Sequence, residues 1–549
     1  MSASSKKKQR SEESVAKLTE KQLAERKETR QLKIYTTVFV VVLALMLVAA
    51  IGFGITKGIR NSGILARSTT ALTIDGTELN SAEMSYFYVD AVQNYLSTYG
   101  DYISMFGPDT SKPLNEQVFS QETGKTWADY FLELAQQQAV NVYALSNAAQ
   151  AAGHTLSEAE KAEIDATISN LGLYGAYYGF SDAGQYIKAM YGNGADEASL
   201  RAYMERNALA SSYSSAYSNS LTFTDEELAD CDAEDPIQYN SYSYNSYYLP
   251  VSAFYEGGTA NDSGVTTYSD EEKAAAAEKA LETAQALTGE SITSLEALDG
   301  AIASLAINAE AEEPVASTAF KNVLYSQVNS VIASWVTEEG RTEGDVTYIE
   351  NSSTTTAEDG TETTTVNGYY VVYYLGMTDN NIPLANVRLI LVSFQGGTAD
   401  ANGNTVYTDA EKAAAKLEAE DLLAQWQSGK ASEETFAEMA KEHSTDPGSA
   451  DNGGLYEGVY PGQMVAAFND WCFDGRKPGD TGIVETNYGY HVMFYSGDNE
   501  TTFRSYMLKN TLTNKAYDAW YQGLVEAANA SMVPGKTTYL PMDMVINGR

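Results

Sequence analysis

The feature that most constrains the fold is an internal repeat in the second half of the chain. Residues 257–273 (GGTANDSGVTTYSDEEK) align without gaps on residues 396–412 (GGTADANGNTVYTDAEK). Each copy follows an apolar run that predicts a strand, 247–254 or 389–394, and each leads into an Ala-rich stretch that predicts a helix. Two such copies predict a tandem pair of small modules, since a solenoid needs roughly three repeats or more.

The second copy carries two further motifs, residues 444–454 (STDPGSADNGG) and 487–492 (NYGYHV), with Gly462-Gln463-Met464 between them. Their order and spacing resemble the parvulin (PpiC-type) family of peptidyl-prolyl isomerases, over a stretch from 387 to about 495. X-Pro bonds isomerise slowly enough to limit folding. The resemblance therefore implies a protein that assists folding.

The resemblance also implies a site in the second copy, residues 381–499. His491 and Asp446 match catalytic positions of the family. The matching substrate-binding positions are Met464, Phe468, Gln463, Val459, Thr486, Tyr488 and Leu389.

Leu389 stands where the family has the first histidine of a hydrogen-bonded pair, so the resemblance implies reduced activity. Two structural alternatives stay open. His491 could be a buried structural residue, and Met464 and Phe468, spaced i and i+4, could be core residues on one helix face.

The first copy, residues 231–380, is predicted to be a degenerate parvulin-like module. It lacks the Asp-Pro-Gly-Ser-Ala stretch, and Tyr370 stands in the place of His491. A Thr-rich insertion, residues 352–365, predicts a polar hairpin tip. We interpret this copy as a structural or client-binding relic.

Near the N-terminus, residues 34–55 (IYTTVFVVVLALMLVAAIGFGI) contain no charge and match the length needed to span a bilayer. Residues 1–33 are basic, which predicts a cytoplasmic tail, and residues 56–69 predict a stalk. We expect a single-pass membrane protein whose C-terminal domains are extracytoplasmic. The alternative is a secretory signal peptide, whose apolar core is usually shorter.

Residues 70–230 predict a mostly helical domain, entered by a hairpin at 71–80. Helix starts are indicated by capping boxes at Ser157 and Thr224. The position beside parvulin-like modules resembles the chaperone domain of exported foldases. Residues 500–549 are predicted to pack back on this domain through a helix at 503–532, and 537–540 to add a short strand. The predicted fold class is therefore α+β: a transmembrane helix, a helical chaperone domain and two modules with small antiparallel sheets.

The chain is acidic, with 74 Asp and Glu against 35 Lys and Arg and a formal net charge of −39. This charge excludes nucleic acid as a partner. It could attract metal ions or basic unfolded chains, or it could serve solubility alone.

Metal and redox chemistry find little support in the sequence. Cys231 and Cys472 lie far apart, outside any CxxC or zinc spacing, which favours two free thiols over a disulfide. Residues 400–411 space oxygen atoms as a calcium loop would, but Thr405 replaces the required glycine, and Thr408 with Glu411 fits a capping box. We predict no cofactor and no metal.

Three functions follow from these patterns. The first is an extracytoplasmic folding factor that isomerises X-Pro segments of unfolded or partly folded exported polypeptides and acts as a chaperone. The second is an inactive holdase that uses both modules only for client binding, for which Tyr-rich runs at 174–180 and 239–248 are suited. The third is an adhesin or envelope scaffold.

Overall fold

The structure is a computed structural model that describes residues 62–260, 265–357, 359–400, 403–533 and 537–546. The predicted cytoplasmic tail (1–33), membrane span (34–55) and the first part of the stalk lie outside the described residues. Within these residues, no helix combines the length and apolar character that a bilayer crossing requires.

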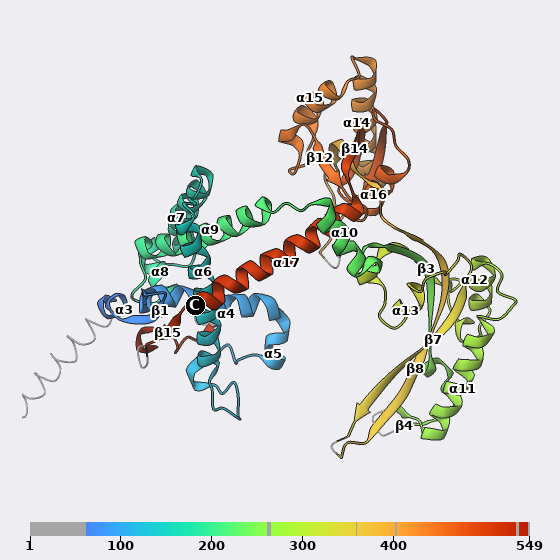
Figure 1. The fold of residues 1–549 in the computed structure, drawn as a ribbon, viewed down its shortest axis with the longest axis horizontal. Coiled ribbons are helices and arrows are strands. Elements are labelled where there is room, and N and C mark those ends of the chain that lie inside the picture. The colour runs from blue at the N-terminus through green and yellow to red at the C-terminus, as the bar shows by residue number, and fades with distance from the viewer. Residues whose placement is uncertain (1–61, 261–264, 358, 401–402, 534–536, 547–549) are drawn as a thin grey trace, which may run out of the picture. The chain divides into compact units, whose positions relative to one another are not determined.

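The described chain has the α+β class with small antiparallel sheets, which confirms that part of the prediction (Figure 1). It divides into two compact units. The helical unit contains the residues up to 221 and those from 516 onward. The tandem unit contains residues 222–515.

The helical unit begins with the predicted hairpin, which the structure confirms. Its elements are α3 (Ile64–Ser68), β1 (Thr70–Ile74), β2 (Thr77–Asn80), α4 (Ser81–Tyr99), α5 (Ile103–Phe106), α6 (Trp127–Ala151), α7 (Glu158–Tyr177), α8 (Ala183–Tyr191) and α9 (Glu197–Ser220). Asn80, Thr126 and Ser157 each form a capping box at a helix start, as predicted for Ser157. These caps satisfy N–H groups that a helix start leaves free.

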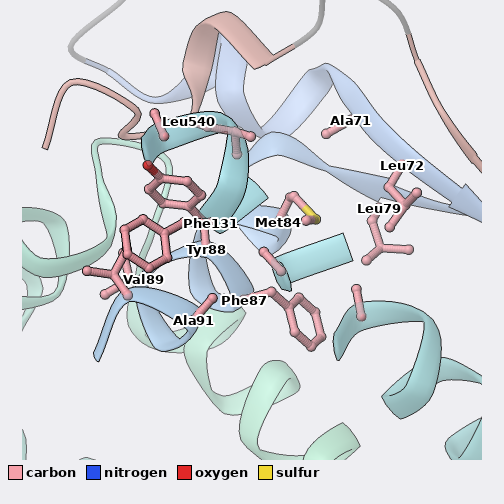
Figure 2. Packing of buried hydrophobic residues seen from close by; sticks show 14 of the residues in the cluster. Ala71, Leu72, Leu79, Met84, Phe87, Tyr88, Val89, Ala91, Phe131 and Leu540 are labelled. Carbon is pink, nitrogen blue, oxygen red and sulfur yellow. The ribbon is translucent and has the colours of Figure 1, made fainter. Parts of the chain in front are cut away.

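The core of the helical unit lies between the hairpin and the helices α4 and α6. Figure 2 shows Met84, Phe87 and Tyr88 of α4 gathered with Phe131 of α6. Leu540, from the C-terminal segment, belongs to the same buried cluster. Aromatic and aliphatic burial of this kind is the main favourable contribution to folding.

The C-terminal segment makes further contacts within the helical unit. Helix α17 (Phe503–Ala527) spans both units, and within the helical unit its Trp520 ring stacks on Tyr217, with 3.8 Å between ring centroids. Strand β15 (Ala530–Met532) then pairs antiparallel with β1. The prediction of a strand at 537–540 is wrong, because residues 537–539 form a 3₁₀ turn. The free edge of β1 pairs with β15 instead.

The tandem unit opens with α10 (Asp225–Glu234), capped by Thr224 as predicted, and continues with the first copy. That copy's elements are β3 (Ser241–Pro250), β4 (Thr259–Ala260), β5 (Thr266–Thr267), α11 (Asp270–Ala286), α12 (Leu295–Ala303), β6 (Thr318–Leu324), α13 (Ala333–Val336), β7 (Val346–Thr356) and β8 (Glu362–Thr378). Its sheet has the order β6-β3-β8-β7, antiparallel throughout.

The second copy has the same architecture. Its elements are β9 (Pro383–Ser393), β10 (Thr398–Ala399), β11 (Thr405–Val406), α14 (Asp409–Ser428), α15 (Glu433–His443), β12 (Leu455–Val459), α16 (Ala466–Phe473), β13 (Thr481–Thr486) and β14 (Gly489–Thr502). The sheet order β12-β9-β14-β13 corresponds strand for strand to the first copy. Thr408 caps α14 and Glu411 also accepts from the Gly397 N–H, so this carboxylate serves the loop and the cap.

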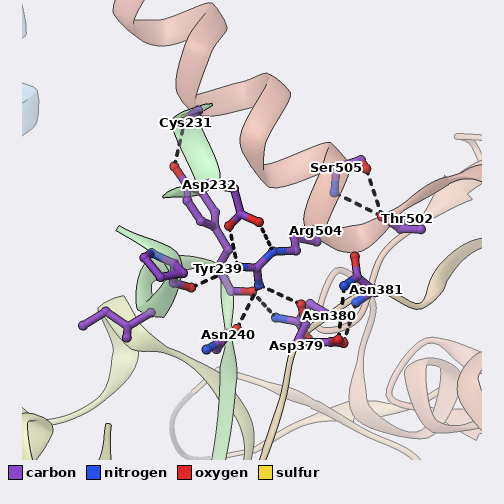
Figure 3. A network of polar contacts seen from close by, with 12 residues as sticks. Cys231, Asp232, Tyr239, Asn240, Asp379, Asn380, Asn381, Thr502, Arg504 and Ser505 are labelled. Atoms are coloured by element: carbon purple, nitrogen blue, oxygen red, sulfur yellow. Dashed lines mark hydrogen bonds and ion pairs between the residues drawn. The ribbon is translucent and has the colours of Figure 1, made fainter. Parts of the chain in front are cut away.

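A buried arginine joins the two copies to the segments at either end of the tandem unit. Arg504, at the start of α17, is 8% exposed. Its guanidinium donates to the carboxylate of Asp232 on α10, the side chain of Asn240, and the carbonyls of Pro236 and Asp379 (Figure 3). Since Asp379 lies in the linker between β8 and β9, one guanidinium fixes α10, α17 and that linker together.

Candidate functional site

The site predicted from the sequence lies on one face of the second-copy sheet. Along β9, side chains alternate between the two faces. Ile390 and Val392 pack with α14, while Leu389 and Leu391 face the side that carries α16. We call the second face the site face. Its buried members are Ala385, Val387, Leu389, Leu391, Val459, Phe468, Trp471, Cys472, Val484, Met493 and Tyr495.

The apolar walls expected for a proline slot belong to this cluster. Val459 and Phe468 are buried, and Met464 is half-buried at the cluster edge. Met464 and Phe468 do not share a helix face, because α16 begins at Ala466 and Met464 lies in the preceding turn. Met464 therefore offers apolar surface that Val459 and Phe468, as core residues, do not.

His491 is buried on β14, at 7% exposure, beside Phe468, whose ring lies edge-on with its centroid 5.6 Å away. Nε2 lies 2.9 Å from the Thr486 hydroxyl. Burial lowers the pKa of His491 to about 4, and the charge of Asp446 opposes this only in part. The imidazole is therefore neutral at pH 7.

The two ring nitrogens of His491 differ in their hydrogen bonding. Nδ1 is buried and has no hydrogen-bond partner among the described residues. Leu391 is directly opposite His491 in the pairing of β9 and β14, and Leu389 lies two residues away on the same face. Both side chains are aliphatic, so neither can bond to the imidazole.

Asp446 is half-buried in the loop that follows α15, and the Thr445 N–H ties that loop to the Leu391 carbonyl at 2.9 Å. Asp446 Oδ2 accepts from the Ser449 hydroxyl at 2.5 Å and from the Tyr456 hydroxyl at 3.0 Å. Its hydrogen bonds thus go to two hydroxyl groups and not to His491.

Tyr456 is a site residue that the sequence analysis missed. Burial and the neighbouring Asp446 raise the pKa of its phenol, so it stays protonated and can donate. The pairing register of β12 shifts between Tyr456 and Val459, and this bulge brings residues three apart onto one face. A strict two-residue alternation from Val459 would have assigned Tyr456 to the opposite face.

The remaining predicted residues lie around this centre. Tyr488 is 65% exposed, and its N–H donates to the Thr486 hydroxyl at 3.2 Å. Gln463 is exposed and its Oε1 accepts from the Tyr460 N–H at 3.1 Å, which closes the turn before Met464. Gln463 therefore shapes the turn.

Two glycines of the sequence motifs allow the close contacts that assemble the site. A Cβ on Gly454 would lie 2.1 Å from the Leu389 carbonyl oxygen, and Gly454 has a φ of +74°. A Cβ on Gly489 would lie 2.1 Å from the Val392 oxygen, with a φ of +147°. Only glycine suits such positions, so Gly454 lets its loop approach β9, and Gly489 lets the start of β14, the strand that carries His491, approach β9 as well.

The strand registers define the counterpart of each site residue in the first copy. Gly368 pairs with Pro250 as Gly489 pairs with Ser393, so Tyr370 corresponds to His491. Gln327 accepts from the Leu324 N–H as Gln463 does from Tyr460, so the next residue, Val328, corresponds to Met464. Phe320 pairs with Tyr244 of β3, and Tyr456 pairs with Val387 of β9. Tyr244 and Val387 lie at the same position of their strands, so Phe320 corresponds to Tyr456.

Comparison with known proteins bears on the second copy. Residues 369–496 match the family model of the PPIC-type PPIASE domain. The chain is 43% identical over 60 residues to the Foldase protein PrsA of Geobacillus sp. (strain WCH70), a match that covers 11% of this chain and 22% of that protein. It is 32% identical over 106 residues to the Foldase protein PrsA 1 of Listeria innocua serovar 6a, covering 18% and 36%.

The chain thus spans only about a fifth to a third of the length of these relatives. Among solved structures, PrsA from Bacillus subtilis is 13% identical, covers 84% of this chain and 91% of its own, and has a TM-score of 0.25. A TM-score this low supports no conclusion. The match of residues 369–496 confirms the predicted resemblance: this segment is a PPIC-type parvulin domain, and part of the chain is similar to PrsA foldases.

Proposed function

We propose that this chain is a folding factor for exported polypeptides, in which the second copy isomerises X-Pro bonds and the helical unit holds unfolded clients. The observation that carries the proposal is the neutral, buried His491 beside Thr486 and the apolar cluster, within the segment that matches a parvulin domain. In this proposal, Asp446 and His491 form the polar side, and Met464 receives the proline ring.

The chemistry fits these groups. Rotation about an X-Pro bond requires no nucleophile, and it is accelerated by any environment that favours the twisted amide over the planar one. Apolar surface at Met464 removes water from the proline, and the hydroxyl groups of Thr486 and Tyr456 supply fixed dipoles in place of that water.

The decisive experiment is a prolyl-isomerisation assay of the full chain on a short X-Pro peptide. We expect Met464→Ala to lower kcat/KM about tenfold or more, since a methionine side chain that buries the proline contributes about 1.5–3 kcal/mol. The matched control is Val328→Ala, the same position in the first copy, which should leave the activity unchanged. Equal losses in both variants, or no activity above the uncatalysed rate in the wild type, would contradict the proposal.

Leu389→His tests the missing histidine directly. A histidine there restores a candidate partner for the buried Nδ1 of His491, and we expect kcat/KM to rise. Unchanged activity would mean that the broken pair does not limit catalysis.

A second candidate function, a holdase without catalysis, is favoured by features of the helical unit. A cleft of about 780 Å³ is lined by residues of α4, α6, α7 and α9, among them Asp90, Glu160 and Tyr203. At the end of α7, Leu173 and Tyr177 are exposed, Tyr177 at 84%. An acidic cleft suits unfolded chains with basic residues, and exposed aromatic rings suit chains with apolar residues. Suppression of client aggregation that survives in Met464→Ala, together with absent isomerisation, would favour this function.

The proposed location is the outer face of a membrane, anchored through residues 34–55 with the basic residues 1–33 inside. Protease added to intact cells should digest the described domains and leave a short N-terminal fragment. A fully protected chain would contradict this orientation.

A further inference from the structure

The hairpin of the first copy extends beyond its own sheet. Strand β3 ends at Pro250, opposite Gly368 of β8. Beyond that point β7 and β8 continue as a two-stranded ribbon, in which 352–356 pair with 362–366 and no third strand is present among the described residues. In the second copy the corresponding strand β13 stops at Thr486, opposite Gly489. The ribbon therefore belongs to the first copy alone.

The hydrogen-bond pattern at the ribbon tip shows which backbone groups face outward. The Ala357 N–H donates to the Thr361 carbonyl at 2.9 Å. Antiparallel pairs alternate between bonded and non-bonded, so Thr355 and Ser353 direct their N–H and C=O groups toward β8. Thr354 and Thr356 then direct theirs away from β8, to the open edge. The Thr354 and Thr364 hydroxyls lie 3.0 Å apart, as expected for the closer, non-bonded pair.

This edge lacks the usual protection against strand addition. Exposed edges are normally blocked by lysine, proline, a bulge or an inward charge. The register shift of β7 lies at Asn351 and Ser352, where the ribbon leaves the sheet, and 353–356 continue regularly. Residues 352–356 (SSTTT) are all exposed and include neither a charge nor a proline. Since a two-stranded ribbon is only marginally stable alone, a third strand would stabilise it.

We infer that the outer edge of β7, from Ser352 to Thr356, binds an extended segment of an unfolded polypeptide as an added strand. The inference rests on the proposed function as a folding factor, but it does not require catalysis. Short hydroxyl side chains offer little apolar surface, so the main-chain groups of Thr354 and Thr356 supply the attraction. Such binding accepts many sequences, as a factor with varied clients requires.

Charge favours a basic or neutral client over a second copy of this chain. The ribbon tip carries Asp359 and Glu362, and the sequence from 342 to 387 contains no Lys or Arg. Antiparallel pairing of two β7 edges centred on Thr354 would bring Asp359 of one copy near Glu350 of the other. Like charges in such a pairing are destabilising.

The experiment compares two double variants of the full chain, with reduced, carbamidomethylated ribonuclease A, a basic chain that cannot refold, as a permanently unfolded probe. Thr354→Pro with Thr356→Pro removes both outward N–H groups and leaves the inward pairs intact, as proline is tolerated on an edge whose N–H faces solvent. Thr354→Ala with Thr356→Ala is the control, since it changes side chains and keeps both N–H groups.

We expect the probe to slow amide exchange at Thr354 and Thr356 in the wild type, and the alanine control to bind it equally well. The proline variant should bind the probe about tenfold more weakly, because two hydrogen bonds are lost. Unchanged exchange protection of Ser353 and Thr355 in that variant would show that β7 and β8 remain paired.

Two outcomes would overturn the inference. One is exchange at Thr354 and Thr356 that the probe does not slow, even where it binds elsewhere on the chain. The other is protection that grows with protein concentration in the absence of the probe, which would identify a second copy as the occupant. Neither result would change the outcome of the isomerisation assay. Conversely, an absence of isomerase activity would not contradict protection of the β7 edge by the probe.

Discussion

The two copies of the tandem unit share a frame but differ where chemistry is expected. In the first copy the Arg341 Nε donates to the Trp335 carbonyl at 2.6 Å, and the guanidinium lies over the indole. In the second copy, Arg476 makes the same two contacts with Trp471. The same Trp–Arg arrangement is therefore present in both copies.

A second element of the frame is also shared. The N–H groups of Gly344 and Gly479 donate to the carbonyls of Tyr374 and Tyr495. Asp345 and Asp480, the next residues, accept in return from the N–H groups of those tyrosines. The frame therefore persists although the surrounding side chains differ.

The differences concentrate on the site face. In the first copy Tyr370 occupies the His491 position, with its hydroxyl bonded to Asn329 and its ring against Tyr248. Phe320 replaces Tyr456 and stacks on Tyr244. Aromatic side chains thus occupy the two positions where the second copy has a histidine and a phenol. The comparison teaches that the shared frame forms in the first copy without these polar groups, so the frame itself does not require them.

Of the substitutions below, only one at Arg504 should change the stability of both copies, because Arg504 binds the linker between them. We expect Arg504→Met to lower the free energy of unfolding of the tandem unit by about 3–5 kcal/mol, since Asp232 is left without its partner. In thermal unfolding of the full chain, the two copies should unfold in one transition in the wild type and in separate transitions in the variant. If the variant unfolds as the wild type does, the guanidinium does not couple the copies.

The same substitution at matched glycines should distinguish the copies. Gly489→Ala introduces a Cβ 2.1 Å from a carbonyl at a positive φ, while Gly368→Ala introduces one 2.6 Å from the Leu249 oxygen without that φ. We expect losses of about 3 kcal/mol or more for Gly489→Ala and a smaller loss for Gly368→Ala. Urea unfolding measures both, and equal losses would contradict the role of the positive φ.

Local patterns in the sequence were sufficient for much of the fold. The hairpin at 71–80 and the capping boxes at Ser157, Thr224 and Thr408 depend on neighbouring residues, and the structure confirms them. Cys231 and Cys472 are free thiols in the structure, as predicted. The domain boundaries and the roles of the site residues stay predictions.

What the sequence did not reveal depends on distant contacts. Arg504 meets Asp232 across 272 positions of the chain, and no local pattern indicates that pairing. Strand β15 forms only because β1 offers it an edge. The contacts that both copies share do have a short sequence pattern. It consists of the Gly-Asp pairs at 344–345 and 479–480, each of which follows a Trp and an Arg. Aligning those pairs would have extended the repeat beyond 257–273.

His491 should give the second copy a pH dependence that the first copy lacks. Its pKa is about 4 in the folded chain, against an ordinary value of 6.5, because burial disfavours the charged ring. Between these values the unfolded chain binds the proton and the folded chain does not. The free energy of unfolding should therefore fall by up to about 3 kcal/mol as the pH drops from 6.5 toward 4.

The control for this pH effect is His491→Gln, which cannot be protonated in this range. The difference in urea midpoint between wild type and variant, followed from pH 7 to pH 4, isolates the histidine from the carboxylates. Tyr370 gains no positive charge in this range, so Tyr370→Phe should leave the pH profile unchanged. A wild-type profile parallel to that of His491→Gln would mean that the imidazole is accessible to protons in the folded state.

The smallest expected effect comes from exchanging one hydroxyl between the copies. Tyr456→Phe gives the second copy the side chain that Phe320 supplies in the first, and it removes the donor 3.0 Å from Asp446. We expect a loss of about 1–2 kcal/mol, since a hydrogen bond to a charged group is lost while Ser449 still donates to the carboxylate. The reciprocal Phe320→Tyr adds a hydroxyl with no such carboxylate and should not stabilise the first copy. In the isomerisation assay Tyr456→Phe should lower kcat more than it raises KM if the phenol orients Asp446 toward the twisted amide. A change in stability without any change in kcat would make Tyr456 a structural residue, and the polar side of the site would then consist of Asp446, Thr486 and His491 alone.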